Sequence, residues 1–134
     1  MKDPTGRGDI TEIHVAAALM RAGRTVLRPI SAGLRYDLLI DNADGTFARV
    51  QCKTGIMKDG FVTFRVRSFD ARRPNGVSYR GQIESFGVFC PQSGRTYLVP
   101  MSALTASDST ARLRVRPARN GQRTGIRMAE EFEI

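Results

Sequence analysis

The stretch YDLLIDNADGTFARVQCKT, residues 36–54, contains two short strand-like runs joined by the polar turn NADGT. Side chains alternate between the two faces of a strand, so Val50 and Cys52 in the second run point to one face. Gln51 and Lys53 lie two residues apart and point to the other face. The stretch therefore predicts a β-hairpin with one apolar face and one polar face.

The same hairpin carries an acid, Asp37, near the start of its first strand. When two strands pair antiparallel through a turn, the start of the first lies across from the end of the second. Counting inward from the turn at 41–46 places Asp37 near Gln51 and Lys53. The geometry of the hairpin is therefore expected to gather a carboxylate, an amide and an ammonium group.

This set of groups suits the hydrolysis of a phosphodiester. A carboxylate and neighbouring oxygens can hold Mg²⁺, which prefers octahedral oxygen ligands and retains several waters. Such a metal polarises the phosphoryl oxygen and lowers the pKa of a bound water that attacks it. A lysine beside the metal can stabilise the developing negative charge or position the water. Gln51 would contribute a neutral oxygen, and the backbone carbonyl of Cys52 another.

The segment before the hairpin predicts a helix over 8–23. Asp9 is a candidate N-cap, and Glu12 follows three residues later, as in a capping box. Gly23 supplies the stop. The predicted core face of this helix consists of apolar residues at helical spacing: Ile13, Ala16, Ala17 and Met20.

The rest of the chain reads as a meander of short strands without internal repeats. Alternation and turn residues predict strands over 24–30, 35–41, 47–55, 61–69, 85–91 and 95–100. Proline, Asn-Gly and charge predict a loop over 70–82, the turn QSG at 92–94 indicates a hairpin, and 101–107 is a candidate helical turn. This order predicts an α/β or α+β sheet with a helix on one face.

Length and composition indicate one globular domain over 1–134. Apolar residues form 41% of the 134, enough for a core in a chain too short to divide comfortably into two domains. The chain has no apolar run of about 18 residues, the length that suggests a membrane span. The N-terminal MKDPTGRGD lacks the apolar segment of a signal peptide, so we expect an intracellular protein.

The net charge of +8 comes mostly from arginine, since the lysines are Lys2, Lys53 and Lys58 alone. The guanidinium fork of arginine matches phosphate oxygens, so this excess favours a polyanionic partner. Charge by itself leaves DNA, RNA, the ribosome and an anionic membrane open as partners.

Both cysteines lie in apolar, strand-like runs. Cys52 and Cys90 have no His or Cys nearby at metal-ligand spacing, so we expect buried free thiols. The single histidine, His14, lies on the predicted helix, where we expect it to be structural or exposed rather than catalytic.

The order of the hairpin residues resembles the PD-(D/E)XK nuclease superfamily, through YD at 36–37, QCK at 51–53 and Glu12 in the preceding helix. The closer likeness is to a group that includes intron-encoded homing endonucleases, in which glutamine replaces the second acid. It continues through GDITEIHVAAALMRAG, VLRPI, YDLLID, RVQCKTG, YRGQIESFGVFCP, TYLVP and RNGQRTGIRMAEEFE. The resemblance implies an α/β fold with a restriction-endonuclease-like core, a mixed β-sheet flanked by helices.

Carried over residue by residue, the resemblance implies that Asp37 is the principal metal ligand and that Lys53 is catalytic. Glu12 would act through the metal or its waters, and Gln51 and the Cys52 carbonyl would complete the protein's share of the ligands. The implied cofactor is Mg²⁺, with Mn²⁺ as a substitute.

Two positions depart from the superfamily pattern. Gln51 stands where most members have Asp or Glu, which removes one negative charge and should weaken metal binding. Tyr36 stands where a proline usually precedes the first acid.

Basic residues around a Gly- and Pro-containing loop near the hairpin predict a surface that contacts phosphates. The residues expected to contact DNA are Arg7, Ser31, Arg35, Lys58, Arg65, Arg67, Arg72, Arg73 and Arg80. Tyr79 lies among them, and we expect it to close the core rather than to stack on a base.

The function hypothesis is a Mg²⁺-dependent endonuclease that hydrolyses phosphodiester bonds of double-stranded DNA at specific sites, like a homing endonuclease. One active site per chain and two strands to cut favour a homodimer or homotetramer. A phage or intron setting fits this hypothesis.

Two alternatives remain open. The first is a Holliday junction resolvase, because RPISAG before RYD resembles the archaeal resolvases, which have a serine in that bend, here Ser31. Those enzymes carry an acid where Gln51 stands, which counts against this alternative. The second is a catalytically inactive, basic DNA-binding module, for which the glutamine is the argument.

Overall fold

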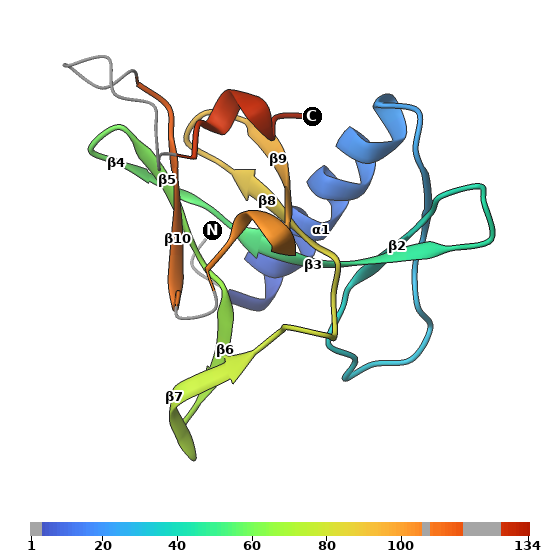
Figure 1. Cartoon of the computed structure of the whole chain (residues 1–134), viewed down its shortest axis with the longest axis horizontal. Helices are drawn as coiled ribbons and strands as arrows, with labels where there is room; N and C mark the ends of the chain where they lie inside the picture. Colours follow the sequence, from blue (N-terminus) through green and yellow to red (C-terminus); the bar gives the residue numbers. More distant parts are fainter. Residues whose placement is uncertain (1–3, 106–107, 117–126) are drawn as a thin grey trace.

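The computed structural model describes residues 4–105, 108–116 and 127–134 (Figure 1). The elements in chain order are α1 (Pro4–Arg21), β1 (Thr25–Leu27), β2 (Leu38–Asp41), β3 (Phe47–Thr54), β4 (Ile56–Lys58), β5 (Phe61–Arg65), β6 (Arg67–Asp70), β7 (Arg73–Ser78), β8 (Ser85–Cys90), β9 (Arg95–Pro100), the 3₁₀ turn η1 (Met101–Ala103), β10 (Thr110–Arg114) and the 3₁₀ turn η2 (Ala129–Glu131).

Five strands form the main sheet, in the order β1-β2-β3-β8-β9. β3 and β8 run parallel, and the other neighbouring pairs of this sheet are antiparallel. α1 packs on the main sheet, and a three-stranded sheet, β10-β5-β4, shares a second core with β8 and β9. β6 and β7 form a separate two-stranded ribbon that extends away from these layers (Figure 1). The predicted α/β class is confirmed, although one α-helix, where several were expected, flanks the sheet in the described part of the chain.

β8 lies between the two cores, and all six of its residues are buried. Phe86 and Val88 contact the core under the three-stranded sheet, whereas Phe89 joins the core under α1. A strand covered on both faces reads as a continuous apolar run, as SFGVFC does. At Gly87 a Cβ would lie 2.5 Å from a methyl group of Val15, so the glycine allows α1 to approach the sheet closely.

α1 begins at Pro4, earlier than the predicted start at residue 8. Proline is favoured in the first turn of a helix, where its missing N–H would have no partner. Asp9 is therefore not the N-cap, Glu12 lies inside the helix, and the predicted capping box is wrong. The predicted stop is confirmed, because Gly23 adopts φ 84° and its N–H donates to the Met20 carbonyl at 3.0 Å.

The face of α1 that packs on the sheet is not the predicted one. Ile13 is 60% exposed and Met20 63% exposed, so the predicted core face is wrong at these two positions, although Ala16 packs against the core under α1. The buried face consists of Thr11, Val15, Ala18 and Leu19. Both sets have helical spacing, so periodicity cannot choose between them. In the observed orientation of the helix, Val15 faces the sheet and lies close to Gly87.

The segment between β4 and β8 also differs from the prediction. The strand expected over 61–69 divides at Val66 into β5 and β6, which belong to different sheets. The loop expected over 70–82 contains β7, which pairs with β6. Proline and glycine disfavour strands, which explains the wrong loop prediction. The Arg67 guanidinium supports the ribbon by donating to the Gly76 carbonyl at 3.0 Å. β4 and β10 were not predicted.

Other predictions for this part of the chain are confirmed. β8 and β9 form an antiparallel hairpin, and a 3₁₀ turn follows β9 within the segment expected to be a helical turn. Cys52 and Cys90 are buried, and neither forms a disulfide.

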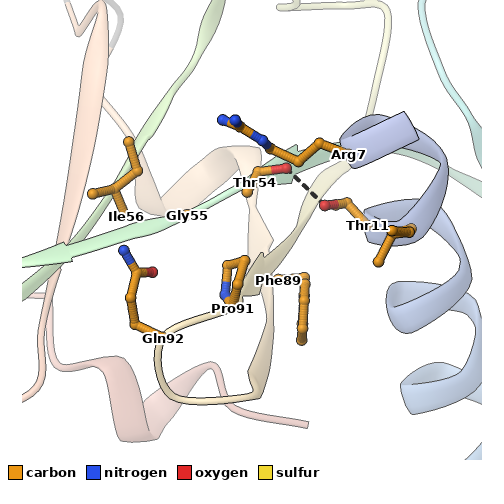
Figure 2. Close-up of a pocket in the computed structure, with 9 residues that line it drawn as sticks. Arg7, Thr11, Thr54, Gly55, Ile56, Phe89, Pro91 and Gln92 are labelled. Atoms are coloured by element: carbon orange, nitrogen blue, oxygen red, sulfur yellow. Dashed lines mark hydrogen bonds between the residues drawn. The ribbon is translucent and has the colours of Figure 1, made fainter. Parts of the chain in front are cut away.

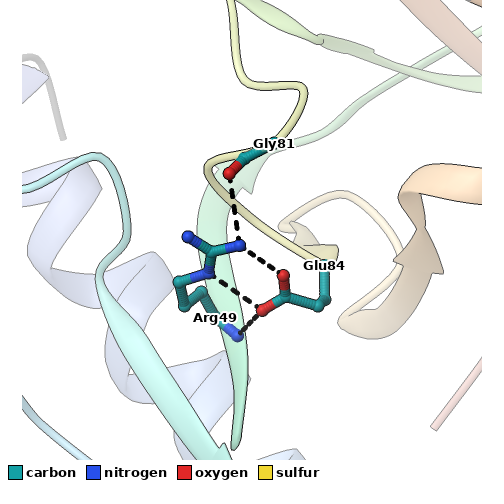
Figure 3. A network of polar contacts seen from close by, with 3 residues as sticks. All are labelled: Arg49, Gly81 and Glu84. Carbon is teal, nitrogen blue, oxygen red and sulfur yellow. Dashed lines mark hydrogen bonds and ion pairs between the residues drawn. The ribbon is translucent and has the colours of Figure 1, made fainter.

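Arg49 and Glu84 join the starts of the two parallel strands (Figure 3). The Arg49 backbone N–H donates to Glu84 Oε1 at 2.7 Å, and the guanidinium donates to both carboxylate oxygens. In return, the Glu84 backbone N–H donates to the Arg49 carbonyl at 3.0 Å. The side-chain hydrogen bonds from Arg49 are the largest reason that the pKa of Glu84 is lowered. This pair aligns β3, which carries the polar hairpin residues, with β8.

We expect Glu84→Gln to destabilise the protein at pH 7 by about 0.5–1 kcal/mol, the size of a solvent-exposed ion pair. The folded-state pKa of Glu84 lies below its ordinary value of 4.5. Its stabilisation is therefore present above that ordinary value and is lost as the pH falls through the folded-state pKa. Urea unfolding at pH 7 and in acid measures both effects.

Glu133→Gln is the matched control, since Glu133 pairs with Arg95 at 2.7 Å through side-chain atoms. It should cost less than Glu84→Gln, because Glu84 also accepts a backbone N–H. An undiminished cost of Glu84→Gln well below pH 4 would contradict the assignment.

Candidate active site

Asp37 stands directly before β2 and extends its pairing with β3. The Asp37 N–H donates to the Val50 carbonyl at 2.8 Å, and the register Leu38↔Val50 places Asp37 opposite Gln51. The Asp37 carboxylate turns onto β3, where Oδ2 accepts the Cys52 backbone N–H at 2.9 Å. The acid is thus fixed to the strand that carries the amide and the lysine.

Gln51 is held by two acceptors. With its amide oriented to satisfy them, the nitrogen donates to Asp37 Oδ2 at 3.2 Å and to the Arg35 carbonyl at 2.8 Å. Lys53 lies further along β3, and its Nζ donates to the Tyr79 hydroxyl at 3.1 Å. Burial raises the pKa of Asp37, and the positive charge of Lys53 partly opposes that rise.

Glu12 approaches from α1. It is partly buried, and Arg28 lies 3.8 Å from its carboxylate. Glu12 and Asp37 both line a pocket of about 310 Å³, together with the bend 28–34, which includes Ser31. The structure therefore brings both acids to one cavity beside β3.

The two carboxylates are in an unfavourable environment for negative charge. Burial raises the pKa of Asp37, and the Cys52 N–H and the charge of Lys53 only partly oppose this. Burial also raises the pKa of Glu12, and the negative charge of Asp37 raises it further. A cation in this cavity would relieve both effects.

The thiol of Cys52 differs from its backbone groups in what it can contribute to the site. Burial raises the pKa of this thiol strongly, and the charges of Asp37 and Glu12 add to the shift. The thiol is therefore neutral and unreactive at physiological pH, which leaves the backbone groups of Cys52 to serve the site.

The donor set fits a hard divalent cation. Among the described residues, no group of three or more His, Cys, Asp or Glu side chains gathers in a metal-binding cluster. The carboxylates of Asp37 and Glu12 line the cavity, and the Gln51 amide and the Cys52 backbone adjoin Asp37 on β3. Mg²⁺ accepts such a set because it prefers oxygen and keeps several waters. A metal that needs nitrogen or sulfur ligands would not be served here.

Three of the arginines expected to contact DNA donate to the protein itself. Arg35 donates to the Gln82 side chain at 2.7 Å, and it also contacts Ser68 and two carbonyls of β7. Arg67 donates within the β6–β7 ribbon, and Arg80 donates to the Leu104 carbonyl at 2.8 Å. These contacts give the three side chains a role in the fold.

The other predicted contact residues lie at several places. Lys58, Arg72 and Arg73 are exposed on or beside β4 and the β6–β7 ribbon. Arg65 is also exposed, with its guanidinium over the Phe69 ring at 5.1 Å from the centroid. Of the arginines expected over 65–80, Arg67, Arg72 and Arg73 therefore lie in the β6–β7 ribbon, whereas Arg65 ends β5 and Arg80 follows β7.

Arg7 lies elsewhere, at a second pocket of about 470 Å³ between α1 and the ends of β3 and β8 (Figure 2). Ile10 and Phe89 contribute apolar walls, and the Thr11 and Thr54 hydroxyls are hydrogen-bonded at 2.7 Å. Its lining includes neither the two acids of the first pocket nor Gln51 or Lys53.

Sequence reasoning missed two neighbours of the predicted catalytic residues. Tyr79 is buried, as predicted, but its hydroxyl contacts Lys53. Arg28 pairs with Glu12, and its charge partly opposes the rise that burial causes in the pKa of that acid. Neither residue lies at a fixed spacing from the hairpin, so no sequence pattern indicated these contacts.

The chain belongs to the PD-(D/E)XK endonuclease family, whose family model matches residues 2–134. Among solved structures, it is similar to a bacterial homing endonuclease, I-Ssp6803I, with a TM-score of 0.68 and 20% identity over 99% of this chain and 88% of that one. It also matches Hjc, a Holliday junction resolvase of Archaeoglobus fulgidus, an archaeal hyperthermophile, with a TM-score of 0.48 and 16% identity over 81% of this chain and 84% of that one. No curated protein sequence matches.

Within the described ranges, no helix combines the length and apolar character that a membrane span requires.

We expect Asp37→Asn to stabilise the metal-free protein at pH 7. The pKa of Asp37 is raised above its ordinary value of 3.8, so ionisation opposes folding and costs stability as the pH rises through the folded-state pKa. Asparagine removes the charge and keeps an oxygen for the Cys52 N–H. Thermal unfolding with EDTA should give the variant a higher Tm at pH 7, with the difference shrinking in acid.

Asp44→Asn is the control with the opposite sign. Hydrogen bonds from Thr46 lower the pKa of Asp44 in its exposed turn, so its ionised form favours folding. This variant should have a lower Tm than wild type at pH 7. A lower Tm for Asp37→Asn as well would contradict the predicted charge strain at the site.

Proposed function

We propose that the chain is a Mg²⁺-dependent endodeoxyribonuclease that cuts double-stranded DNA at specific sites. The observation that carries this proposal is the attachment of Asp37 to β3, where Oδ2 lies 2.9 Å from the Cys52 nitrogen and 3.2 Å from the Gln51 amide nitrogen. This arrangement sets an acid beside the amide and lysine of a QxK sequence in a chain of the PD-(D/E)XK endonuclease family.

Asp37 would be the principal ligand of the metal, with the Gln51 amide oxygen and the Cys52 carbonyl beside it. Glu12 would act through waters of the metal, since it reaches the cavity from α1. When bound, a divalent cation polarises the scissile phosphate and lowers the pKa of a water nucleophile. Mn²⁺ would substitute for Mg²⁺ at such oxygen ligands.

Lys53 supplies a positive charge that acts on Asp37. Its ammonium group would stabilise the negative charge that develops on the phosphate as the new bond forms. The Tyr79 hydroxyl holds the ammonium group in the absence of substrate, at 3.1 Å. Asp37 and Lys53 are therefore both required for rapid cleavage, for different reasons.

Recognition of duplex DNA would use the β6–β7 ribbon and the exposed basic residues around it. A two-stranded ribbon fits the major groove of B-DNA, where base edges can be read. The net charge of +8 favours association with DNA at low salt. A homodimer or homotetramer would present two active sites, one for each DNA strand. An enzyme of this kind would suit a gene in a phage or an intron.

We expect Asp37→Ala and Lys53→Ala each to reduce the rate of Mg²⁺-dependent cleavage by about 10²–10⁴-fold, since each removes a group that acts in the transition state. DNA affinity without metal should change by no more than about threefold, because most of that affinity comes from phosphate contacts. Asp44→Ala, which alters an exposed turn acid, is the control and should cut like wild type.

The substrate is identified with a randomised duplex library and an immobile four-way junction under the same conditions. Recurrent ends in the library support site-specific cleavage of duplex DNA. Symmetric cuts in the junction without sequence preference would instead establish a resolvase. DNA binding without cleavage in Mg²⁺ or Mn²⁺ would establish an inactive binding module and overturn the proposal.

Gln51→Glu tests the amide of the QxK sequence. The new carboxylate would face the Arg35 carbonyl and Asp37, which now accept the Gln51 amide N–H groups at 2.8 and 3.2 Å. We expect a loss of about 1–3 kcal/mol in the stability of the metal-free protein, because two acceptors lose their donor. The added charge should lower the Mg²⁺ concentration for half-maximal cleavage by about tenfold.

Gln51→Ala is the comparison that removes the amide without adding charge. It should raise the Mg²⁺ requirement, whereas Gln51→Glu lowers it. Equal metal requirements in all three proteins would show that the residue does not bind the metal.

A further inference from the structure

We propose that Tyr79 is a positioning residue for Lys53, and that its hydroxyl fixes the ammonium group for catalysis. The inference rests on the proposed function, because it assigns Lys53 to the reaction. It adds a residue from outside the hairpin to the machinery of cleavage.

Tyr79 has the rigidity that such a role needs. The residue is 4% exposed, and its ring meets Phe86 edge-on, with centroids 5.5 Å apart and an interplanar angle of 88°. Phe86 is fully buried on β8 of the main sheet. The position of the Tyr79 hydroxyl is therefore set by the core rather than by solvent.

The contact with Lys53 uses both parts of the tyrosine. Lys53 Nζ donates to the hydroxyl at 3.1 Å and lies 4.9 Å from the ring centroid. A lysine side chain loses much rotamer freedom when it is held in one place. A partner on a rigid ring reduces that freedom before substrate binds, so less order has to be imposed in the transition state.

Arg35 secures the same ring from a second side. Its guanidinium carbon lies 3.9 Å from the Tyr79 ring centroid. Its N–H groups donate to Gln82 and Ser68, both at 2.7 Å, and to the Val77 and Ser78 carbonyls. These hydrogen bonds come from several segments around Tyr79, so they resist movement of the ring.

Arg35 also connects this aromatic support to the amide of the site. Its backbone carbonyl accepts the Gln51 amide N–H at 2.8 Å, while its side chain stacks on Tyr79. Gln51 and Lys53 are thus supported by the backbone of Arg35 and by Tyr79. The partner that the buried Tyr79 hydroxyl has found is thus the lysine of the proposed site.

Tyr79→Phe removes the hydroxyl and keeps the ring. We expect kcat for cleavage to fall by about tenfold, with KM and the Kd for DNA each changed by less than about twofold, because the lost contact acts on the chemical step. Tyr97→Phe is the matched control, since Tyr97 is 1% exposed in the same core cluster and lies on β9, two strands from Lys53. It should leave kcat within about twofold of wild type.

Two kinetic results would overturn the proposal. One is a Tyr79→Phe enzyme with the kcat of wild type. The other is an equal loss of kcat in Tyr79→Phe and Tyr97→Phe with equal losses of Tm, which would trace the effect to general stability.

A readout without catalysis separates this inference from the proposed function. The chain has three lysines, Lys2, Lys53 and Lys58, so ¹⁵N-lysine spectra are simple and Lys53→Arg identifies the Lys53 signal. We expect the wild-type Lys53 ammonium protons to exchange with water more slowly than those of exposed Lys58. Tyr79→Phe should accelerate the Lys53 exchange by about threefold or more, because the hydrogen bond is lost.

The spectra and the cleavage assay can fail separately. Equal exchange rates of Lys53 in wild type and Tyr79→Phe would overturn the positioning of the ammonium group, whatever the protein cuts. Protected Lys53 in a protein that cuts no DNA would instead overturn the proposed function and leave the contact without a catalytic role.

Discussion

The site depends on one hydrogen bond, from the backbone N–H of Cys52 to the Asp37 carboxylate. Asp37 precedes β2 and would otherwise be an ordinary acid at the end of a strand. The bond directs its carboxylate onto β3, beside the Gln51 amide. Burial on this strand raises the pKa of Asp37, and Glu12 adds a second negative charge from α1. The geometry that brings the acids together therefore also stores electrostatic strain.

The arrangement explains how a site with two carboxylates can retain a third, neutral donor in place of an acid. An amide can donate to Asp37 and to a main-chain carbonyl, which a carboxylate cannot do. Gln51 makes both contacts in this structure. The site is thus kept in order without metal by hydrogen bonds, at the expense of one negative charge that would attract a cation. Under the proposed function, the stability of the metal-free site and its affinity for metal would oppose each other at Gln51.

Much of the hairpin could be predicted because its information is local. Alternation along β3 and the length of the turn bring Asp37 opposite Gln51, as counting along the strands indicates. The roles of these residues in catalysis stay predictions. The buried face of α1 was predicted wrongly because two sets of its residues have helical spacing. The choice between them depends on packing against Gly87, which lies on a strand distant in sequence. β7 was missed because its proline and glycine disfavour a strand, and the side-chain contacts that support the ribbon are not visible in sequence.

The hairpin between residues 37 and 53 has a consequence for how such a protein can change. Its acid, amide and lysine are neighbours along the chain, whereas the exposed cations of the β6–β7 ribbon belong to a later segment. Under the proposed function, substitutions in the ribbon would alter which DNA is bound, whereas the residues assigned to the reaction lie in the earlier hairpin. Arg35 links the two segments. Its guanidinium donates to two carbonyls of β7, and its backbone carbonyl accepts the Gln51 amide N–H. Under the proposed function, a substitution of Arg35 would thus affect both selectivity and turnover, whereas substitutions of the exposed ribbon residues would affect selectivity alone.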